Sequence, residues 1–141
     1  MQFLFQNAIE RYKDCPPPHY ERREMGEVYR WVFADMADHR NFMPQYQRDP
    51  ARFEHHTDQT RCLALALSFF DSSASAINRF RALHLQIGAT VFKTLGSNLA
   101  SGRIGLDDGV NSATDEQGHF SHHPYHTVDY ATRFHIIEPL S

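Results

Sequence analysis

The chain has 141 residues and a mass of 16.4 kDa, which suffices for one ordinary domain and is too little for two. Its formal net charge of −3 at pH 7 argues against general nucleic-acid binding, because proteins that bind phosphate backbones normally carry a basic face. The longest apolar stretch, Cys62 to Phe70, is far shorter than the roughly 20 residues of a membrane-spanning helix. We therefore expect a single domain over residues 1–141, with no membrane segment.

The N-terminal part is expected to be a short helix followed by a proline linker. Apolar residues recur at helical spacing over residues 3–13. The run Cys15-Pro-Pro-Pro-His19 then ends the helix, because consecutive prolines cannot continue it and force an extended path. Residues 1–19 thus form the helix and linker, and residues 26–141 form the sheet-containing core.

Period-two alternation of side chains predicts most of the sheet. The expected strands are residues 27–34, 61–69, 90–95, 99–106 and 130–137. In 61–69, bulky leucines and Phe69 alternate strictly with small side chains, which favours a central strand. A helix is the alternative there, since Leu63 and Leu67 are four residues apart.

One longer helix is expected from Asp71 or Ser72, either of which can cap it, to about Leu85. Residues 35–53 and 110–128 are polar and lack a usable period, so we expect irregular structure in both. These patterns predict an α+β fold, with a mostly antiparallel sheet of about four or five strands and two or three helices.

Four histidines crowd the C-terminal third: His119, His122, His123 and His126. Imidazole binds metals and changes charge near neutral pH, so this run is a candidate metal site. Pro124 disfavours a helix that would align all four, and in an extended chain at most two could converge. A solvated or hydrogen-bonding loop is therefore the leading interpretation, and a zinc, nickel, iron or copper site is the alternative.

The sequence contains two cysteines, Cys15 and Cys62, which are too few for a disulfide framework and lack Cys-x-x-Cys spacing. The first residues lack the basic start and cleavage site of a secretory signal. We expect two free thiols in a reducing compartment, and hence a cytoplasmic protein.

Arg30 is expected on the same strand face as Val28 and Val32, where it must reach the sheet edge or meet an acidic partner. Other arginines of the first third interleave with glutamates, which predicts a mixed solvated surface. Arg30, Ser68 at the end of a second strand and Glu138 near a late strand resemble the arginine–serine–glutamate pattern of ADP-ribosyltransferases. The resemblance implies a nicotinamide dinucleotide cofactor, with Arg30 on phosphate, Ser68 at the nicotinamide, Glu138 at the oxocarbenium-like centre and His119 nearby.

The chain also resembles, in outline, small bacterial α+β domains of unassigned function. The residues that carry this outline are Cys15-Pro-Pro, Tyr29-Arg30, Cys62, Ala66-Leu-Ser68, Ala76, Gly102-x-Ile104, Gly109 and Gly118-His119. The leading functional hypothesis is recognition of a protein partner, as in a multi-component or stress-related system. Its candidate contact residues are Tyr29, Trp31, Phe33 and Tyr125, because aromatic side chains are favoured interface anchors. The alternatives are the ADP-ribosyl-transfer or NAD-cleaving enzyme and the metal protein.

Overall fold

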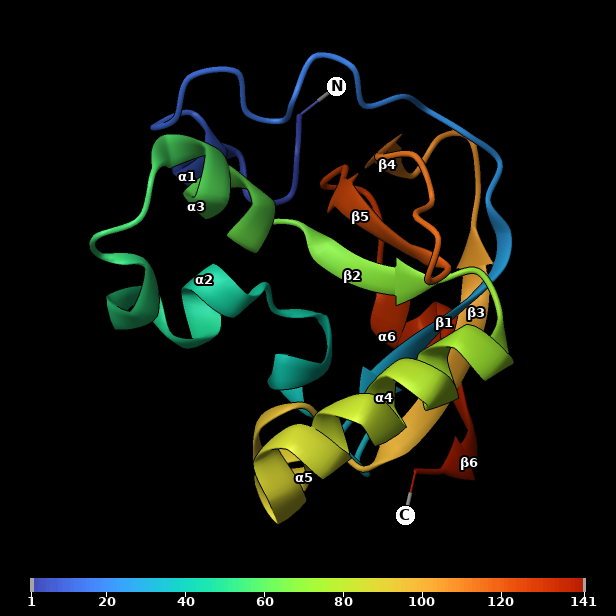
Figure 1. Cartoon of the computed structure of the whole chain (residues 1–141). Helices are drawn as coiled ribbons and strands as arrows, with labels where there is room; N and C mark the ends of the chain where they lie inside the picture. Colours follow the sequence, from blue (N-terminus) through green and yellow to red (C-terminus); the bar gives the residue numbers. More distant parts are fainter. Residues whose placement is uncertain (1, 141) are drawn as a thin grey trace.

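A computed structural model describes residues 2–140, which form an antiparallel six-stranded sheet with helices on both faces (Figure 1). The strands are β1 (Gly26–Val32), β2 (Leu67–Phe70), β3 (Asn98–Ile104), β4 (Gly109–Asn111), β5 (His119–Pro124) and β6 (His135–Pro139). Their spatial order is β4-β5-β2-β1-β3-β6, and every neighbouring pair is antiparallel. The expected α+β class is confirmed, and the sheet is one strand larger than the expected upper count.

Most helices of the described part are single turns. They are α1 (Gln6–Ile9), α2 (Gln45–Arg48), α3 (Asp58–Ala64), α4 (Ser73–Ile87), α5 (Val91–Thr94) and α6 (Tyr130–Arg133), with 3-10 turns η1 (His39–Phe42), η2 (Pro50–Phe53) and η3 (Gly88–Thr90). Only α4 exceeds two turns, and Ser72 caps it by accepting a hydrogen bond from the Ser75 backbone N–H. The predicted helix at this position is confirmed. No helix within residues 2–140 has both the length and the apolar character needed to cross a membrane.

The core has two parts, one on each face of the sheet. Phe69, Phe120 and Phe134 fill the first, which α6 and η1 cover. Phe70 and Phe80 belong to the second, where α4 and α5 lie over the sheet (Figure 1). This two-sided packing explains why Leu67, Phe69 and Phe70 in β2 are all buried.

The predicted strand at 61–69 is wrong in its first half. Residues up to Ala64 belong to α3, whose N-cap Thr57 accepts a hydrogen bond from the Thr60 backbone N–H. Leu63 consequently points outward and is 46% exposed, whereas Leu65 after the helix is fully buried. The helical alternative holds up to Ala64, and the strand begins only at Leu67.

Four other predictions of secondary structure are also corrected. Within residues 90–95, Val91–Thr94 form the helical turn α5, whose Val91 is buried in the same cluster as Phe80 of α4. The polar stretch 110–128 contains most of β4 and all of β5. In β5, His122 and His123 are buried, so they occupy positions that the sequence pattern assigns to apolar residues. The predicted strand at 130–137 begins as α6 and becomes β6 only at His135. In the N-terminal segment, only Gln6–Ile9 of the expected helix is helical.

The sheet is open between β1 and β2. β1 pairs with β3 along all seven of its residues, but it meets β2 only where Tyr29 faces Phe70. Beyond that point the two strands form no further pair, and the gap is lined by Met43, between η1 and α2, and by Gln45, the first residue of α2. The missing backbone pairing would otherwise connect Arg30 and the rest of β1 with β2, and its absence leaves a cleft.

Candidate functional site

The half-buried side chain of Arg30 crosses the gap between β1 and β2. Its Nε donates to the carbonyl oxygen of Asn41 at 2.7 Å, and its Nη1 donates to that of Ser68 at 2.7 Å. The guanidinium carbon lies 5.5 Å from the ring centroid of Phe69 and 5.8 Å from that of Phe42. Neutral carbonyls and aromatic faces hold the group in place but do not neutralise its charge.

No carboxylate within residues 2–140 forms an ion pair with Arg30. The expected acidic partner is therefore not found in this part of the chain, and Arg30 lies in the interior of the sheet order and not at its edge. A partly desolvated cation without a counter-ion is unfavourable unless something else supplies the negative charge.

A second arginine, Arg48 at the end of α2, lies beside Arg30. Its Nη2 donates to the Thr94 carbonyl oxygen at 2.7 Å, and it forms no ion pair within the described chain. Burial and the neighbouring Arg48 charge lower the pKa of Arg30, and burial and Arg40 lower the pKa of Arg48. Arginine starts from so high a pKa that both remain charged at neutral pH. The two cations thus repel each other in a partly dry cleft.

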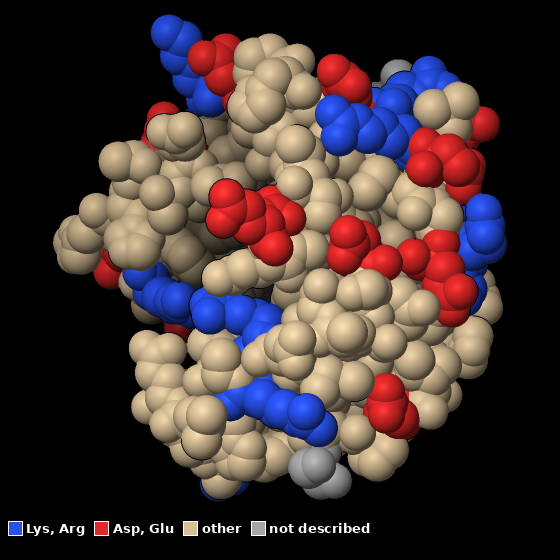
Figure 2. Space-filling view, turned by 45° about the vertical axis from the view of Figure 1, so that its right-hand side comes forward, with Lys and Arg blue, Asp and Glu red and all other residues tan. Residues whose placement is uncertain are grey.

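This cleft is lined by Arg30, Arg48, Gln45 and Ser68 on its polar side and by apolar residues that include Phe70. It continues at Arg48 into a wider groove. The charged residues of the groove are Arg40, Arg48, Arg52, Arg79, Lys93 and one acid, Asp49. On the face drawn in Figure 2, a hollow in the surface has Lys and Arg side chains along one side and Asp and Glu side chains along another. The chain is acidic overall, yet this region carries a local excess of positive charge.

Ser68 and His119 lie on the same face of the sheet, whereas Glu138 is remote from both. Ser68 faces Ser121 and Phe70 faces His119 across the β2–β5 pair, so Ser68 and His119 are diagonal neighbours. Glu138 is on β6, three strands away from β2, which corresponds to about 14 Å at ordinary strand spacing. The expected Arg30–Ser68–Glu138 constellation is therefore not assembled.

His119 itself is held by local contacts. Its ring lies edge-on to Phe70, with centroids 5.5 Å apart, and its Nδ1 is 3.7 Å from Asp115. Burial lowers the pKa of His119 and outweighs the opposing effect of Asp115. The imidazole is therefore mostly neutral at pH 7.

Of the four aromatic residues expected to contact a partner, Phe33 and Tyr125 are buried and Tyr29 and Trp31 are half-buried. The Trp31 Nε1 donates to the Ala76 carbonyl oxygen at 3.0 Å beneath α4, and Tyr29 packs against the same core cluster. Phe33 is buried under the Arg40 guanidinium, and Tyr125 is buried. These side chains contribute to the packing of the core, and none of the four is fully exposed.

The four histidines of the C-terminal run do not converge on one point. His122 is fully buried, where its Nδ1 is 2.6 Å from Asn111 Oδ1 and its Nε2 contacts the Tyr130 hydroxyl. His126 is exposed and its Nδ1 donates to the Gln2 carbonyl oxygen at 2.9 Å. The alternative, a metal site made of these four residues, is not formed within the described chain, and the leading interpretation of a solvated loop is corrected because most of the run is strand β5.

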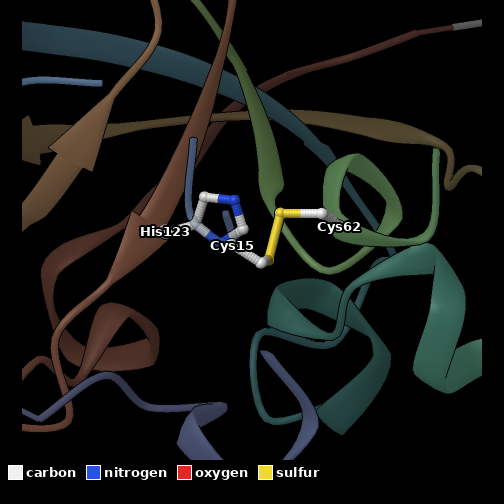
Figure 3. Close-up of side chains that lie close together, drawn as sticks. All are labelled: Cys15, Cys62 and His123. Carbon is white, nitrogen blue, oxygen red and sulfur yellow. A yellow bond between two sulfur atoms is a disulfide. The ribbon is translucent and has the colours of Figure 1, made fainter. Parts of the chain in front are cut away.

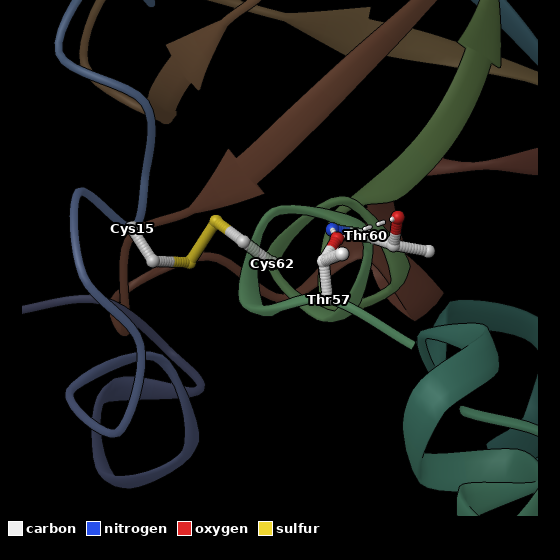
Figure 4. The surroundings of a disulfide bond; sticks show 4 residues. All are labelled: Cys15, Thr57, Thr60 and Cys62. Carbon is white, nitrogen blue, oxygen red and sulfur yellow. Dashed lines mark hydrogen bonds between the residues drawn. A yellow bond between two sulfur atoms is a disulfide. The ribbon is translucent and has the colours of Figure 1, made fainter. Parts of the chain in front are cut away.

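The predicted free thiols are also corrected, because Cys15 and Cys62 form a disulfide (Figure 3). The bond joins the proline-rich segment to α3, close to the Thr57–Thr60 cap (Figure 4). His123 on β5 lies against the two sulfurs (Figure 3). The sequence offered only an even cysteine count as a signal, and two cysteines 47 residues apart do not reveal that they meet.

No protein-family model, no curated protein and no solved structure matches this chain. The candidate site therefore depends on its own geometry. Sequence reasoning identified Arg30 and Ser68 but missed Arg48, which lies in a stretch that lacked periodicity. The interleaved glutamates did not signal the cleft either, since Glu21 and Glu24 pair with Arg23 and Arg103 outside it.

Proposed function

We propose that the chain binds a small phosphate-bearing molecule in the cleft between β1 and β2. The observation that carries this proposal is the pair of adjacent guanidiniums, Arg30 and Arg48, with no carboxylate partner in the described chain. Arginine presents a planar fork of N–H donors that matches phosphate oxygens, so an anion would satisfy the remaining donors and relieve the mutual repulsion. The Ser68 hydroxyl, at the exposed side of the cleft, is available as a further donor.

The groove beyond Arg48 supports a ligand larger than free phosphate. It combines the cations Arg79 and Lys93 with apolar side chains such as Leu83 and Ile87. A nucleotide, which joins anionic groups to a flat ring, has this mixed character. Nicotinamide dinucleotide belongs to the same class. Catalysis is not part of the proposal, because Glu138 lies three strands from Ser68.

Calorimetric titration with ADP at low ionic strength tests the proposal. We expect saturable binding that weakens with added salt, and an affinity loss of at least about tenfold in Arg48→Gln, because a hydrogen bond to a charged group contributes about 1.5–3 kcal/mol. Arg103→Gln is the matched control, since Arg103 is exposed on β3 and already paired with Glu24. Absence of heat with the parent protein, or equal losses in both variants, would refute the assignment.

Recognition of a protein partner is a second proposal, which now depends on a different surface. Leu85 on α4 is 90% exposed, and Ile87 at the end of the same helix is 46% exposed beside the basic groove. Isolated exposed apolar residues are common, so the test targets Leu85, the more exposed of the two. Partner recovery from native cells should be lost in the Leu85→Glu variant and retained in Gln86→Glu. Equal recovery by both would remove this surface from consideration.

A further inference from the structure

His123 contains a buried polar atom without a hydrogen-bond partner. Its Nε2 is inaccessible to solvent, and no group within residues 2–140 hydrogen-bonds to it. Leaving a buried acceptor or donor unsatisfied costs about 1–3 kcal/mol, so native structures seldom do so without a reason. The neighbouring His122 shows the ordinary solution, since both of its ring nitrogens have partners.

The orphaned imidazole lies beside the only two cysteines of the chain. One ligand atom each from Cys15, Cys62 and His123 lies within 4.8 Å of the other two, and the ring faces the sulfurs (Figure 3). The three residues come from the proline-rich segment, α3 and β5. Three chain segments that are distant in sequence therefore bring two sulfurs and one nitrogen to a single point.

A disulfide offers no thiolate to a metal, but the reduced pair would. Two cysteine thiolates and one imidazole are a recurrent zinc ligand set, and a three-residue set leaves the fourth tetrahedral position for solvent or substrate. Cys62 also lines a cavity together with His19, Tyr20 and Gln59, which lies next to the three residues.

We propose that Cys15, Cys62 and His123 form a redox-dependent zinc site. A thiol reductant of the glutathione or dithiol class supplies two electrons and two protons, which break the S–S bond and yield two thiols. Zn²⁺ then binds both sulfurs and the His123 Nε2, and the two thiol protons are released to solvent. A disulfide oxidant of the same class, such as oxidised glutathione, accepts two electrons from the two thiolates and is itself reduced to two thiols; the Cys15–Cys62 bond re-forms, two ligands are lost and the ion is released. The site differs from the expected four-histidine cluster and is independent of the phosphate cleft.

Co²⁺ is a suitable probe, because thiolate coordination gives it an intense charge-transfer absorption. The full chain is reduced with a phosphine, freed of the phosphine without air and titrated with Co²⁺, and Zn²⁺ is then added to displace it. We expect one Co²⁺ per reduced chain, with thiolate-to-cobalt absorption, and none in the oxidised chain. Cys62→Ser and His123→Gln should each weaken binding by more than about tenfold.

His126→Gln is the matched control, since His126 is exposed and lies three residues beyond His123. It should bind Co²⁺ as the parent does. The far-UV circular dichroism spectrum of the reduced parent shows whether the reduced chain is folded, so its Co²⁺ binding can be interpreted without any variant. The proposal is overturned if the reduced chain binds no metal whether folded or unfolded, if the oxidised chain binds equally, or if His123→Gln retains full affinity.

Discussion

Two adjacent histidines show how strongly local surroundings decide the role of one residue type. The Asn111 Nδ2 donates to the Glu21 carbonyl oxygen, so its Oδ1 is an acceptor and His122 carries its proton on Nδ1. The Nε2 of His122 then accepts from the Tyr130 hydroxyl. His122 is thus a satisfied core residue, whereas the Nε2 of His123, one position later, has no partner among residues 2–140.

Removing the Tyr130 hydroxyl should destabilise the protein. In Tyr130→Phe the buried Nε2 of His122 loses its partner, so we expect the free energy of unfolding to fall by about 1–3 kcal/mol in urea denaturation. Tyr12→Phe is the control, because the Tyr12–Tyr46 hydroxyl pair is only partly buried and water can replace the lost bond. A larger loss in Tyr12→Phe would contradict this interpretation of the buried bond.

The same burial predicts acid sensitivity of the oxidised protein. Burial lowers the pKa of His122 to about 3 and that of His123 to about 4, while an unfolded histidine titrates near 6.5. Between about pH 6.5 and 4 the unfolded chain binds more protons, so stability must fall as pH falls. We expect a loss of about 2 kcal/mol per histidine between pH 7 and 5, measured by denaturant titration.

The exposed His126 provides the comparison for that experiment. His126→Gln should keep the full pH dependence, and His123→Gln should lose about half of it. Stability that stays constant between pH 7 and 5 would show that these two imidazoles are not buried in the neutral form.

At the scale of elements, the apolar stretch through 61–69 was ambiguous for a physical reason. Its alternating side chains fit a strand and its i, i+4 leucines fit a helix, so period alone cannot decide between them. The Thr57 cap and Asp58 in the first turn favour helix at its start. The long helix α4 was predictable because its cap and its period agree.

β3 contains a glycine that the packing of its neighbours requires. A Cβ on Gly102 would lie 2.5 Å from the Phe134 ring, so Gly102 lets that ring pack directly on the sheet. Gly102→Ala should therefore lower the free energy of unfolding by about 1–3 kcal/mol in urea. At Gly105 the nearest contact of an added Cβ is the end of the flexible Glu24 side chain at 3.4 Å, so Gly105→Ala should cost much less. Equal costs would contradict the packing argument.

At the scale of the whole molecule, the Cys15–Cys62 bond fixes the N-terminal segment to the remainder. It closes a loop of 47 residues, for which the chain-entropy model gives about 4 kcal/mol of stabilisation. Reduction without metal should lower the free energy of unfolding by this order, as measured by urea titration with and without reductant. Zn²⁺ should restore part of the loss in the reduced parent.

The Cys15→Ala/Cys62→Ala double variant separates the two effects. Neither reductant nor Zn²⁺ should alter its stability, since it has neither the crosslink nor the sulfur ligands. A reductant effect of equal size in this variant would assign the loss to something other than the disulfide.

The sequence by itself determined the α+β class, the helix after Ser72 and the strands at β1 and β3, because capping and side-chain period act over a few residues. Only the tertiary structure decided which distant groups meet. Arg30 and Arg48 line one cleft because β1 and β2 stop pairing after Tyr29. The fold also brings Cys15, Cys62 and His123 together. It places Glu138 three strands away from Ser68. Strand order and packing fix these juxtapositions, and neither is encoded in local periodicity.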